Sequence, residues 1–362
     1  MKILILEPYF TGSHKRWAEG YKKHSKHEVE ILTMKGQFWK WRMHGGAVTL
    51  AREFKSKNLK PDLILATDML DLSTFLALTK TKIRSIIYFH ENQLAYPWSP
   101  MDRDIKAKRD HHYSFINYIS ALSADNVLFN SKFHMDIFFK ELHTFLKHFP
   151  DYNELETIQI IKKKSQVLKL GIDLSKLDNS KTTKYDKPLI LWNHRWEYDK
   201  NPEMFFKCLQ TVKHQGYNFY LVVLGENFSS TPKIFEKAKK IFKDNILHWG
   251  YVKDHNSYAK WLWRANILPV TSYQDFFGIS VMEAIYCGAY PLLPNRLSFP
   301  ELFPIEVHKK YFYHNENELN KKLVDILNNF QNLDFKALKK ESKSYDWNYL
   351  APKYDAKIAS LL

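Results

Sequence analysis

The chain has 362 residues, of which 45% are hydrophobic and 15% aromatic, and its 54 Lys and Arg against 39 Asp and Glu give a net charge of +15. This much apolar side chain suits two folded cores and excludes an intrinsically disordered protein, and without a signal segment or a run of about 18 apolar residues we expect a protein of the cytoplasm. The charge favours a polyanionic partner such as RNA or an anionic membrane surface, although biased codon usage also produces lysine-rich chains.

Short apolar runs, separated by segments of helical length, follow one another in the first half of the chain. We expect strands at residues 2–7, 28–33, 62–67, 84–89 and 126–130. We expect helices at 13–25, 45–57, 71–79 and 104–123. Ser13 and Asp71 are suitable N-cap residues for the first and third of them. Nearly continuous apolar strands of this kind are typical of a parallel sheet that is buried on both faces. Residues 1–170 are therefore predicted to form a Rossmann-like domain.

The second half repeats this alternation after a break. A charged helical stretch at 131–164 and an apolar run at 166–170 lead into residues 171–187, which are polar and aperiodic and are expected to be a linker. Further strands are expected at 188–193, 219–224, 246–249, 266–270 and 289–293. The prediction is an α/β protein with a second Rossmann-like domain over 188–345 and a terminal amphipathic helix over 346–362 that packs back toward the first domain. Ligands of such open sheets bind at the carboxyl ends of the strands, so we expect a site in the cleft between the two domains.

The sequence offers no convincing metal site. Cys208 and Cys287 lie in different expected elements without ligand spacing, and we expect two free, buried thiols. Residues 102–104 spell Asp-Arg-Asp, but they precede a long predicted helix, where capping is the more ordinary role. His111 and His112 are adjacent on that helix and so point in different directions. We therefore expect no metal and no cofactor.

The strongest local pattern runs from Asp275 to Pro291. It places an acidic residue in a loop, then Phe277-Gly278 at the start of a helix, then Glu283 about one turn into that helix. Backbone N–H groups at a helix N-terminus suit a phosphate, and the two carboxylates suit the hydroxyl groups of a sugar and a ribose. The plainer alternative is that the acidic residue only interacts favourably with the helix dipole.

A second pattern follows the first expected strand of the second domain. Arg195 and Lys200 lie five residues apart in a loop that enters a helix with Pro202 in its first turn. A guanidinium and an ammonium placed in this way would neutralise a diphosphate and stabilise it as a leaving group. The alternative is two solvated surface cations.

Three loops after expected strands of the first domain hold further candidates. Gly12 and Ser13 follow the first strand, where a glycine permits close approach of a ligand to the backbone. Asp68 follows the third strand and either orients an acceptor diol or serves a structural role. His90 and Asn92 follow the fourth strand, and a histidine there is as often structural as functional.

Aromatic and basic side chains are interleaved in the segment Phe38, Trp39, Lys40, Trp41 and Arg42, which we expect to be a loop. This combination stacks bases and contacts phosphates in proteins that bind RNA. The alternative is that both tryptophans pack in the domain interior while the two cations extend outward.

Residues 275–291 resemble the E-x7-E signature of glycosyltransferase family 4, in which an acidic residue is followed by FG, EA and CGxP. The resemblance implies the GT-B fold, retention of anomeric configuration, and a catalytic group composed of Arg195, Lys200, Asp275 and His90. It also implies that the donor contacts Phe277, Gly278, Ile279 and Glu283, with Glu283 on the nucleotide ribose. The family's first acidic residue is usually Glu, and Asp275 is one methylene shorter.

Four longer strings, at residues 12–15, 38–51, 67–79 and 88–100, look like the tRNA-queuosine alpha-mannosyltransferase group, a branch of this family. The resemblance covers residues 1–130 and 188–304. It implies GDP-mannose as the donor and, as the acceptor, a cyclopentene hydroxyl group of queuosine at the wobble position of a tRNA. Gly12 and Ser13 then become donor-binding candidates. The acceptor-binding candidates are Trp39, Lys40, Trp41, Arg42, Asp68 and Asn92.

Three alternatives stay open from the sequence. A transferase of the same family could act on a lipid-linked or other glycan acceptor at a membrane surface, to which the positive charge is equally suited. A nucleotide-sugar epimerase would share the architecture without an acceptor. A non-catalytic RNA-binding protein would keep the fold and the charge, and Asp275 in place of Glu is the feature that favours it.

Overall fold

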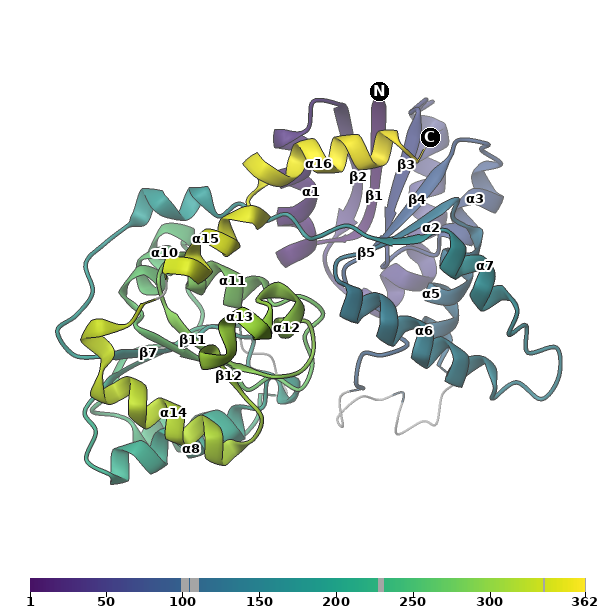
Figure 1. Cartoon of the computed structure of the whole chain (residues 1–362). Helices are drawn as coiled ribbons and strands as arrows, with labels where there is room; N and C mark the ends of the chain where they lie inside the picture. The colour runs from purple at the N-terminus through teal and green to yellow at the C-terminus, as the bar shows by residue number, and fades with distance from the viewer. Residues whose placement is uncertain (99–103, 105–110, 227–230, 335, 362) are drawn as a thin grey trace. The chain divides into compact units, whose positions relative to one another are not determined.

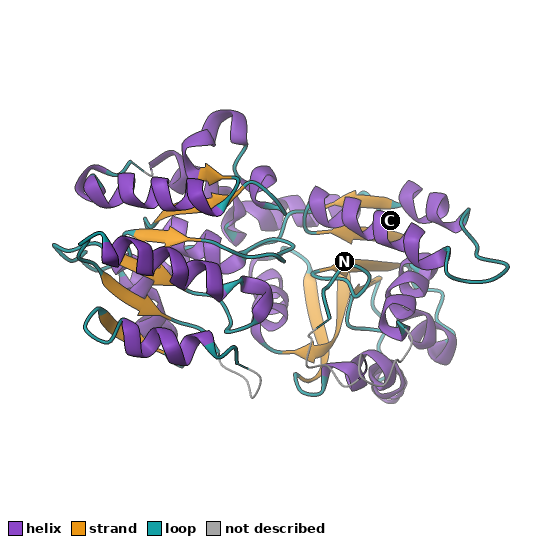
Figure 2. Cartoon of the chain, turned by 90° about the horizontal axis from the view of Figure 1, so that it is seen from below, coloured by secondary structure: helices purple, strands orange, loops and turns teal. Residues whose placement is uncertain are grey.

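The computed structural model describes residues 1–98, 104, 111–226, 231–334 and 336–361. The chain divides into two compact units, Met1–Ile172 with Trp347–Leu362, and Asp173–Asp346 (Figure 1). Each unit has its own parallel sheet with helices on both sides (Figure 2).

The sheet of the first unit has six parallel strands in the order β2-β1-β3-β4-β5-β6. The strands are β1 Lys2–Phe10, β2 Glu28–Lys35, β3 Leu63–Thr67, β4 Ser85–Phe89, β5 Asn126–Phe129 and β6 Ser165–Val167. Leu6 pairs with Ala66, and Thr67 pairs with Tyr88, so the carboxyl ends of β1, β3 and β4 lie next to one another. The helices of this unit are α1 Gly12–His24, α2 Trp39–Ser56, α3 Leu72–Thr79, α5 His112–Ser123, α6 Lys132–Leu146, α7 Thr157–Lys163 and α16 Trp347–Ala359.

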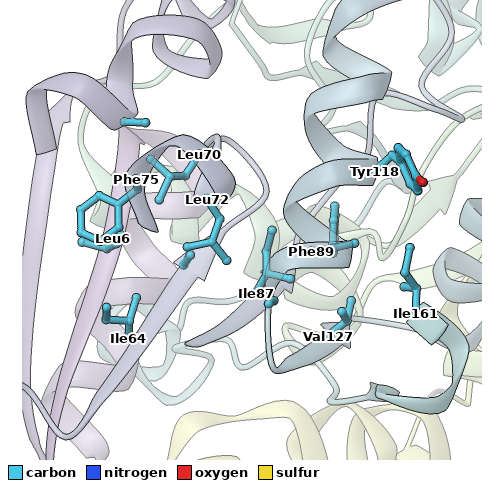
Figure 3. Packing of buried hydrophobic residues seen from close by; sticks show 14 of the residues in the cluster. Leu6, Ile64, Leu70, Leu72, Phe75, Ile87, Phe89, Tyr118, Val127 and Ile161 are labelled. Atoms are coloured by element: carbon cyan, nitrogen blue, oxygen red, sulfur yellow. The ribbon is translucent and has the colours of Figure 1, made fainter. Parts of the chain in front are cut away.

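A continuous apolar core fills the space between this sheet and the helices on one of its faces. Ile64, Ile87 and Val127 come from neighbouring strands, and Phe75 of α3 and Tyr118 of α5 cover them (Figure 3). Full burial of an aliphatic or aromatic side chain contributes roughly 1.5–3 kcal/mol. The Tyr118 hydroxyl group is not left unsatisfied, because it lies 2.9 Å from the Thr157 hydroxyl group. This packing holds the strand ends in a fixed register.

The C-terminal helix α16 belongs to the first unit and packs on α1 (Figure 1). Asp355 of α16 is buried and accepts hydrogen bonds from the Tyr21 hydroxyl group at 2.9 Å and the Ser25 hydroxyl group at 2.6 Å. Trp347 is 1% exposed, and its indole ring lies where a β-carbon on Gly20 or Gly171 would stand, at 2.1 and 2.6 Å. Two glycines therefore form the space that the indole ring occupies.

The sheet of the second unit also has six parallel strands, in the order β12-β11-β10-β7-β8-β9. They are β7 Leu189–Trp192, β8 Tyr220–Val223, β9 Ile246–Trp249, β10 Ile267–Pro269, β11 Tyr290–Pro294 and β12 Phe312–Tyr313. The α-helices are α8 Pro202–His214, α9 Ile234–Ile241, α10 His255–Arg264, α11 Ile279–Tyr286, α12 Phe299–Leu302, α13 Ile305–His308, α14 Glu316–Asn328 and α15 Lys336–Ser342. The short 3-10 helices are η1 Ser175–Ser180, η2 Tyr198–Lys200, η3 Lys309–Tyr311, η4 Phe330–Asn332 and η5 Lys343–Tyr345.

The predicted fold class is confirmed, and several local predictions need correction. Ser13 is not an N-cap, because α1 begins at Gly12 after Thr11, whereas Asp71 does cap α3 by accepting from the Thr74 amide at 3.0 Å. The segment expected to be an aperiodic linker contains η1, and the expected helix over 131–164 is two helices, α6 and α7. Cys208 and Cys287 are free and buried, as predicted. Asp102, of the Asp-Arg-Asp string, lies outside the described residues.

None of the helices described for this chain combines the length and the apolar character that crossing a bilayer requires.

We expect Gly20→Ala to destabilise the protein by about 1–3 kcal/mol, because the added methyl group overlaps the Trp347 ring. Alanine is otherwise about 1 kcal/mol more favourable than glycine inside a helix, so the sign of the change is diagnostic. Thermal unfolding measures it, with Glu19→Ala on the exposed face of α1 as the matched control. An unchanged or raised melting temperature for Gly20→Ala would contradict this account of the packing.

Candidate functional site

Polar side chains gather where three adjacent strands of the first unit end. Glu7 lies near the end of β1, Asp68 directly follows β3, and His90 directly follows β4. His14 comes from the first turns of α1, which follows β1. One ligand atom each from His14, Asp68 and His90 lie within 4.8 Å of one another. The parallel topology thus joins residues that are far apart in the sequence into one cluster.

Glu7 and His14 form a buried ion pair. Nδ1 of His14 lies 2.9 Å from Oε2 of Glu7, and the Tyr9 amide donates to Oε1 of Glu7 at 2.8 Å. Burial raises the pKa of Glu7, but the positive charge of His14 outweighs it and the pKa is lowered overall. Burial lowers the pKa of His14, and the carboxylate of Glu7 outweighs that effect and raises it to about 10. Both groups are therefore charged at neutral pH.

Asp68 and His90 lie beside this pair in a different electrostatic state. The His90 amide donates to Oδ1 of Asp68 at 2.8 Å, and Nδ1 of the His90 ring lies 3.3 Å from the same oxygen. Burial raises the pKa of Asp68 to about 7, partly offset by the charge of His14. Burial, with the charge of His14, lowers the pKa of His90 well below its usual value. The ring of His90 is therefore neutral and packs at 4.6 Å from the Trp17 ring.

His14, Asp68 and His90 are of the types that bind metal ions, and among the described residues their donor atoms lie close enough to be considered. Nδ1 of His14 already faces Oε2 of Glu7 at 2.9 Å, so only Nε2 of this ring could reach an ion. The sequence-based expectation of no metal stays a prediction.

The other candidates near these strand ends have more local roles in the structure. Oδ1 of Asn92 accepts a hydrogen bond from the Ala95 amide at 2.8 Å and so shapes the loop after β4. Gly12 is exposed and has φ +51°, with no atom within 4 Å of the position of a β-carbon. Ser13 is half-buried in the first turn of α1. The part of Gly12 and Ser13 in donor binding, and that of Asn92 in acceptor binding, remains a prediction.

The segment expected to be an aromatic and basic loop is instead the first turn of α2, which begins at Trp39. Trp39 packs at 5.1 Å from the Tyr113 ring, and Lys40 forms an ion pair with the buried Asp104. Trp41 is 63% exposed, and its ring lies against Gly45, which follows one helical turn later. Trp39 therefore packs inward, whereas Trp41 faces solvent, and a role of this turn in RNA binding stays a prediction.

Arg42 and Phe38 flank this turn. The Arg42 guanidinium donates from Nε to the Lys35 carbonyl group at 2.9 Å, which fixes the side chain along the end of β2. Phe38 is 74% exposed and adopts the left-handed conformation with φ +54°. Phe38 belongs to the same aromatic and basic segment of the sequence, and its ring, like that of Trp41, faces solvent.

In the second unit, Lys200 is buried at the end of η2 among acceptors. Its Nζ donates to the Gln274 carbonyl group at 2.7 Å and lies 3.2 Å from Asp199 and 3.4 Å from Asp275. Burial lowers the pKa of Lys200, but Asp275 and Asp199 outweigh it and raise the pKa overall. Lys200 is thus a permanent, fixed cation, and the structure brings it together with Asp275 as the sequence suggested.

Arg195 differs from Lys200 in its surroundings. Its side chain is 46% exposed, and Nη2 lies 3.1 Å from Glu197. The preceding residue, His194, is buried, and burial together with the charge of Lys200 lowers its pKa to about 3. Arg195 is therefore the more exposed of the two cations, and Lys200 is the buried one.

The pattern from Asp275 to Glu283 forms a loop followed by helix α11, as predicted. Gly278, with φ +90°, is the residue before α11, and a β-carbon there would lie 3.0 Å from the Phe299 ring. Oδ1 of Asp275 accepts from the Phe277 amide at 3.3 Å. Ile279 is the first residue of α11, and Glu283 is 4% exposed within it.

Glu283 has a partner that the sequence did not indicate. The Tyr258 hydroxyl group of α10 donates to Oε2 of Glu283 at 2.8 Å. Asp199 was also missed, although it directly precedes Lys200 in the sequence. Glu7 and His14 were missed as well; the signal for Glu7 was a charged residue within an apolar strand, and His14 lies in the distinctive string 12–15.

Two different family models match the chain, and the boundary between them agrees with the boundary between the two units. The family model described as tRNA-queuosine alpha-mannosyltransferase N-terminal matches residues 2–172, and the model of glycosyl transferases group 1 matches residues 175–341. Among solved structures, sucrose-phosphate synthase from Thermosynechococcus elongatus is similar with a TM-score of 0.74 and 14% identity, over 100% of this chain and 99% of that chain. The catalytic domain of starch synthase IV from Arabidopsis thaliana has a TM-score of 0.71 and 13% identity, over 99% and 98%.

These structural similarities, at low sequence identity, show the GT-B fold alone. A relative at the sequence level is the tRNA-queuosine alpha-mannosyltransferase of Drosophila melanogaster, which is 32% identical over 336 residues. The aligned region covers 90% of this chain and 86% of that protein. The chain belongs to the tRNA-queuosine alpha-mannosyltransferase family.

Proposed function

We propose that this chain transfers mannose from GDP-mannose to queuosine in a tRNA, with retention of the anomeric configuration. The observation that carries the proposal is the similarity to the Drosophila protein over both units, including the N-terminal unit that carries the family's own model. The net charge of +15 suits a tRNA acceptor.

The second unit binds the donor in this proposal. Lys200 and Arg195 stabilise the diphosphate as the bond between it and the sugar breaks. Asp275, held beside Lys200, accepts hydrogen bonds from sugar hydroxyl groups, and the backbone amides at the start of α11 face the donor. Glu283 accepts from the ribose, and Tyr258 holds its carboxylate in place.

The first unit binds the acceptor. Asp68 and His90 lie at the carboxyl edge of its sheet, where open α/β sheets bind ligands. Phe38 and Trp41 present exposed aromatic rings, and Arg42 a half-buried guanidinium beside them, for the RNA around the modified base. As the acceptor oxygen forms its bond to the anomeric carbon, the proton of its hydroxyl group passes to the departing diphosphate.

The direct test is incubation of the protein with queuosine-containing tRNA and either GDP-mannose or UDP-hexoses, followed by nuclease digestion and mass spectrometry of the nucleosides. We expect a gain of one hexose on queuosine with GDP-mannose. The same tRNA without queuosine is the control. If no donor modifies queuosine, the proposal fails, and binding of the protein to anionic liposomes then tests a lipid-linked acceptor.

We expect Trp41→Ala to change the KM for tRNA and Trp39→Ala to change the stability of the fold. Loss of the exposed Trp41 ring removes a stacking surface worth about 1–3 kcal/mol, so the KM for tRNA rises by about 5- to 100-fold with little change in thermal stability. Trp39→Ala lowers stability by about 1–3 kcal/mol because its ring packs on Tyr113. Steady-state kinetics and thermal unfolding distinguish the two. Equal KM values for Trp41→Ala and the unchanged protein would remove Trp41 from the RNA surface.

We expect Tyr258→Phe to raise the KM for the nucleotide sugar by about tenfold, because a hydrogen bond to a charged group contributes roughly 1.5–3 kcal/mol. The KM for tRNA should not change. Tyr217→Phe, also half-buried in the second unit, is the matched control. A donor KM equal to that of the control would show that Tyr258 does not orient Glu283 for the nucleotide.

A further inference from the structure

The proposed function so far uses Asp68 and His90 but leaves the buried pair Glu7 and His14 without a role. Glu7 is 0% exposed and His14 is 7% exposed. Taking two charges out of water costs several kcal/mol for each ion, and their attraction only offsets this when the geometry is good. A pair of this kind at the carboxyl edge of a sheet therefore calls for an explanation beyond stability.

The geometry leaves His14 one donor for another molecule. Both oxygens of Glu7 are occupied, one by Nδ1 of His14 at 2.9 Å and the other by the Tyr9 amide at 2.8 Å. Since Nδ1 faces Glu7, Nε2 is the ring nitrogen that remains. A carboxylate that accepts from one nitrogen of a histidine fixes the orientation of the ring and the position of the other nitrogen.

Orphaned polar atoms lie beside this donor. Nε2 of His90 and Nδ2 of Asn92 are buried and lack a hydrogen-bond partner within the part of the chain that the structure describes, and Nδ1 of His90 lies 3.3 Å from Asp68 without the geometry of a hydrogen bond. Each such atom costs about 1–3 kcal/mol when it stays unsatisfied. The rings of Trp17 and Tyr88, at 4.6 and 4.8 Å, hold the His90 ring in place. The cluster is rigid, yet its hydrogen bonds are incomplete, which points to a polar ligand.

The charges of the cluster select the class of ligand. The groups that face His14 are Glu7 from β1, Asp68 after β3, and His90 and Glu91 after β4. One ring nitrogen of the cationic His14 lies within 4.8 Å of a carboxylate oxygen of Asp68 and of a ring nitrogen of the neutral His90. A hydroxyl group is the common ligand that accepts from the first and donates to the second at the same time.

We propose that His14 is an acceptor-binding residue: Glu7 holds it as a charged hydrogen-bond donor, and its Nε2–H, together with Asp68 and His90, binds a hydroxyl group of the acceptor nucleoside. Glu7 is then a positioning residue that acts through His14. The inference rests on the proposed function for the identity of the acceptor. His14 already carries its proton, so it does not remove the proton of the attacking hydroxyl group.

The test compares Glu7→Gln and His14→Gln with His24→Gln, a histidine of the same helix that bonds only to the Gly20 carbonyl group in the structure. We expect the KM for queuosine-containing tRNA to rise about tenfold or more in the first two variants, as for loss of a hydrogen bond from a charged donor. The donor KM and the His24→Gln variant should stay unchanged. Thermal unfolding identifies any variant that does not fold.

Protonation gives a readout that a purely structural role would not move. Nitrogen-15 NMR of labelled histidines should show His14 of the unchanged protein as imidazolium at pH 8, because its pKa is raised to about 10. In Glu7→Gln the two largest effects that raise the pKa of His14 are lost and burial opposes only the charges of Asp68 and Glu91, so the imidazolium fraction at pH 8 should fall. Lowering the pH toward 5.5 should then bring back the imidazolium signal of His14 in Glu7→Gln.

Two results would overturn the inference while the proposed function stands: an unchanged tRNA KM in folded Glu7→Gln and His14→Gln, or a neutral His14 ring in the unchanged protein at pH 8. Zinc or manganese bound at one ion per chain, and lost in His14→Gln, would also overturn it, since the ring would then be a metal ligand. No mannose transfer by the unchanged protein would instead reject the proposed function, and the NMR measurement would still report the state of His14.

Discussion

The organisation of this protein depends on parallel sheets that are buried on both faces. Within such a strand every backbone group is paired and almost every side chain is apolar, so polar side chains gather where the strands end. In the first unit, the pairing of β1 with β3 and of β3 with β4 brings three such ends together. Glu7, Asp68 and His90 therefore lie in one cluster, although about 80 residues of sequence separate the first from the last.

Each unit contains a buried cation that is paired with carboxylate groups. Glu7 compensates His14 in the first unit, and Asp199 and Asp275 compensate Lys200 in the second. A buried ion must be held by partners with good geometry, so each of these cations has a fixed position. Fixed charges are useful in a transferase, because they need not reorganise when charge develops on the reacting groups. Arg195 differs in being half-exposed, with its guanidinium 3.1 Å from Glu197.

The first turn of α2 shows how a helix divides a string of similar residues. Side chains of successive residues point about 100° apart, so Trp39 packs on Tyr113 while Trp41 faces solvent. Gly45 lies under the Trp41 ring, and a β-carbon there would come within 2.9 Å of it. Structural and candidate RNA-binding residues therefore alternate within one turn.

The fold class followed from the sequence, because strands that are buried on both faces appear in it as short continuous apolar runs separated by segments of helical length. The string around Asp275 and Glu283 indicated the family. The short strand β12 and the start of α2 at Trp39 were not predicted, since packing rather than local propensity decides them. Partners distant in sequence were equally hidden: the Tyr258 hydroxyl group on Glu283 depends on the packing of α10 beside α11. Glu7 and His14 are only seven residues apart, yet the sequence shows neither their burial nor the neighbouring Asp68 and His90. Which charges are buried, and beside which neighbours, is decided by the tertiary structure, because desolvation and pairing depend on distance in space and not on distance along the chain.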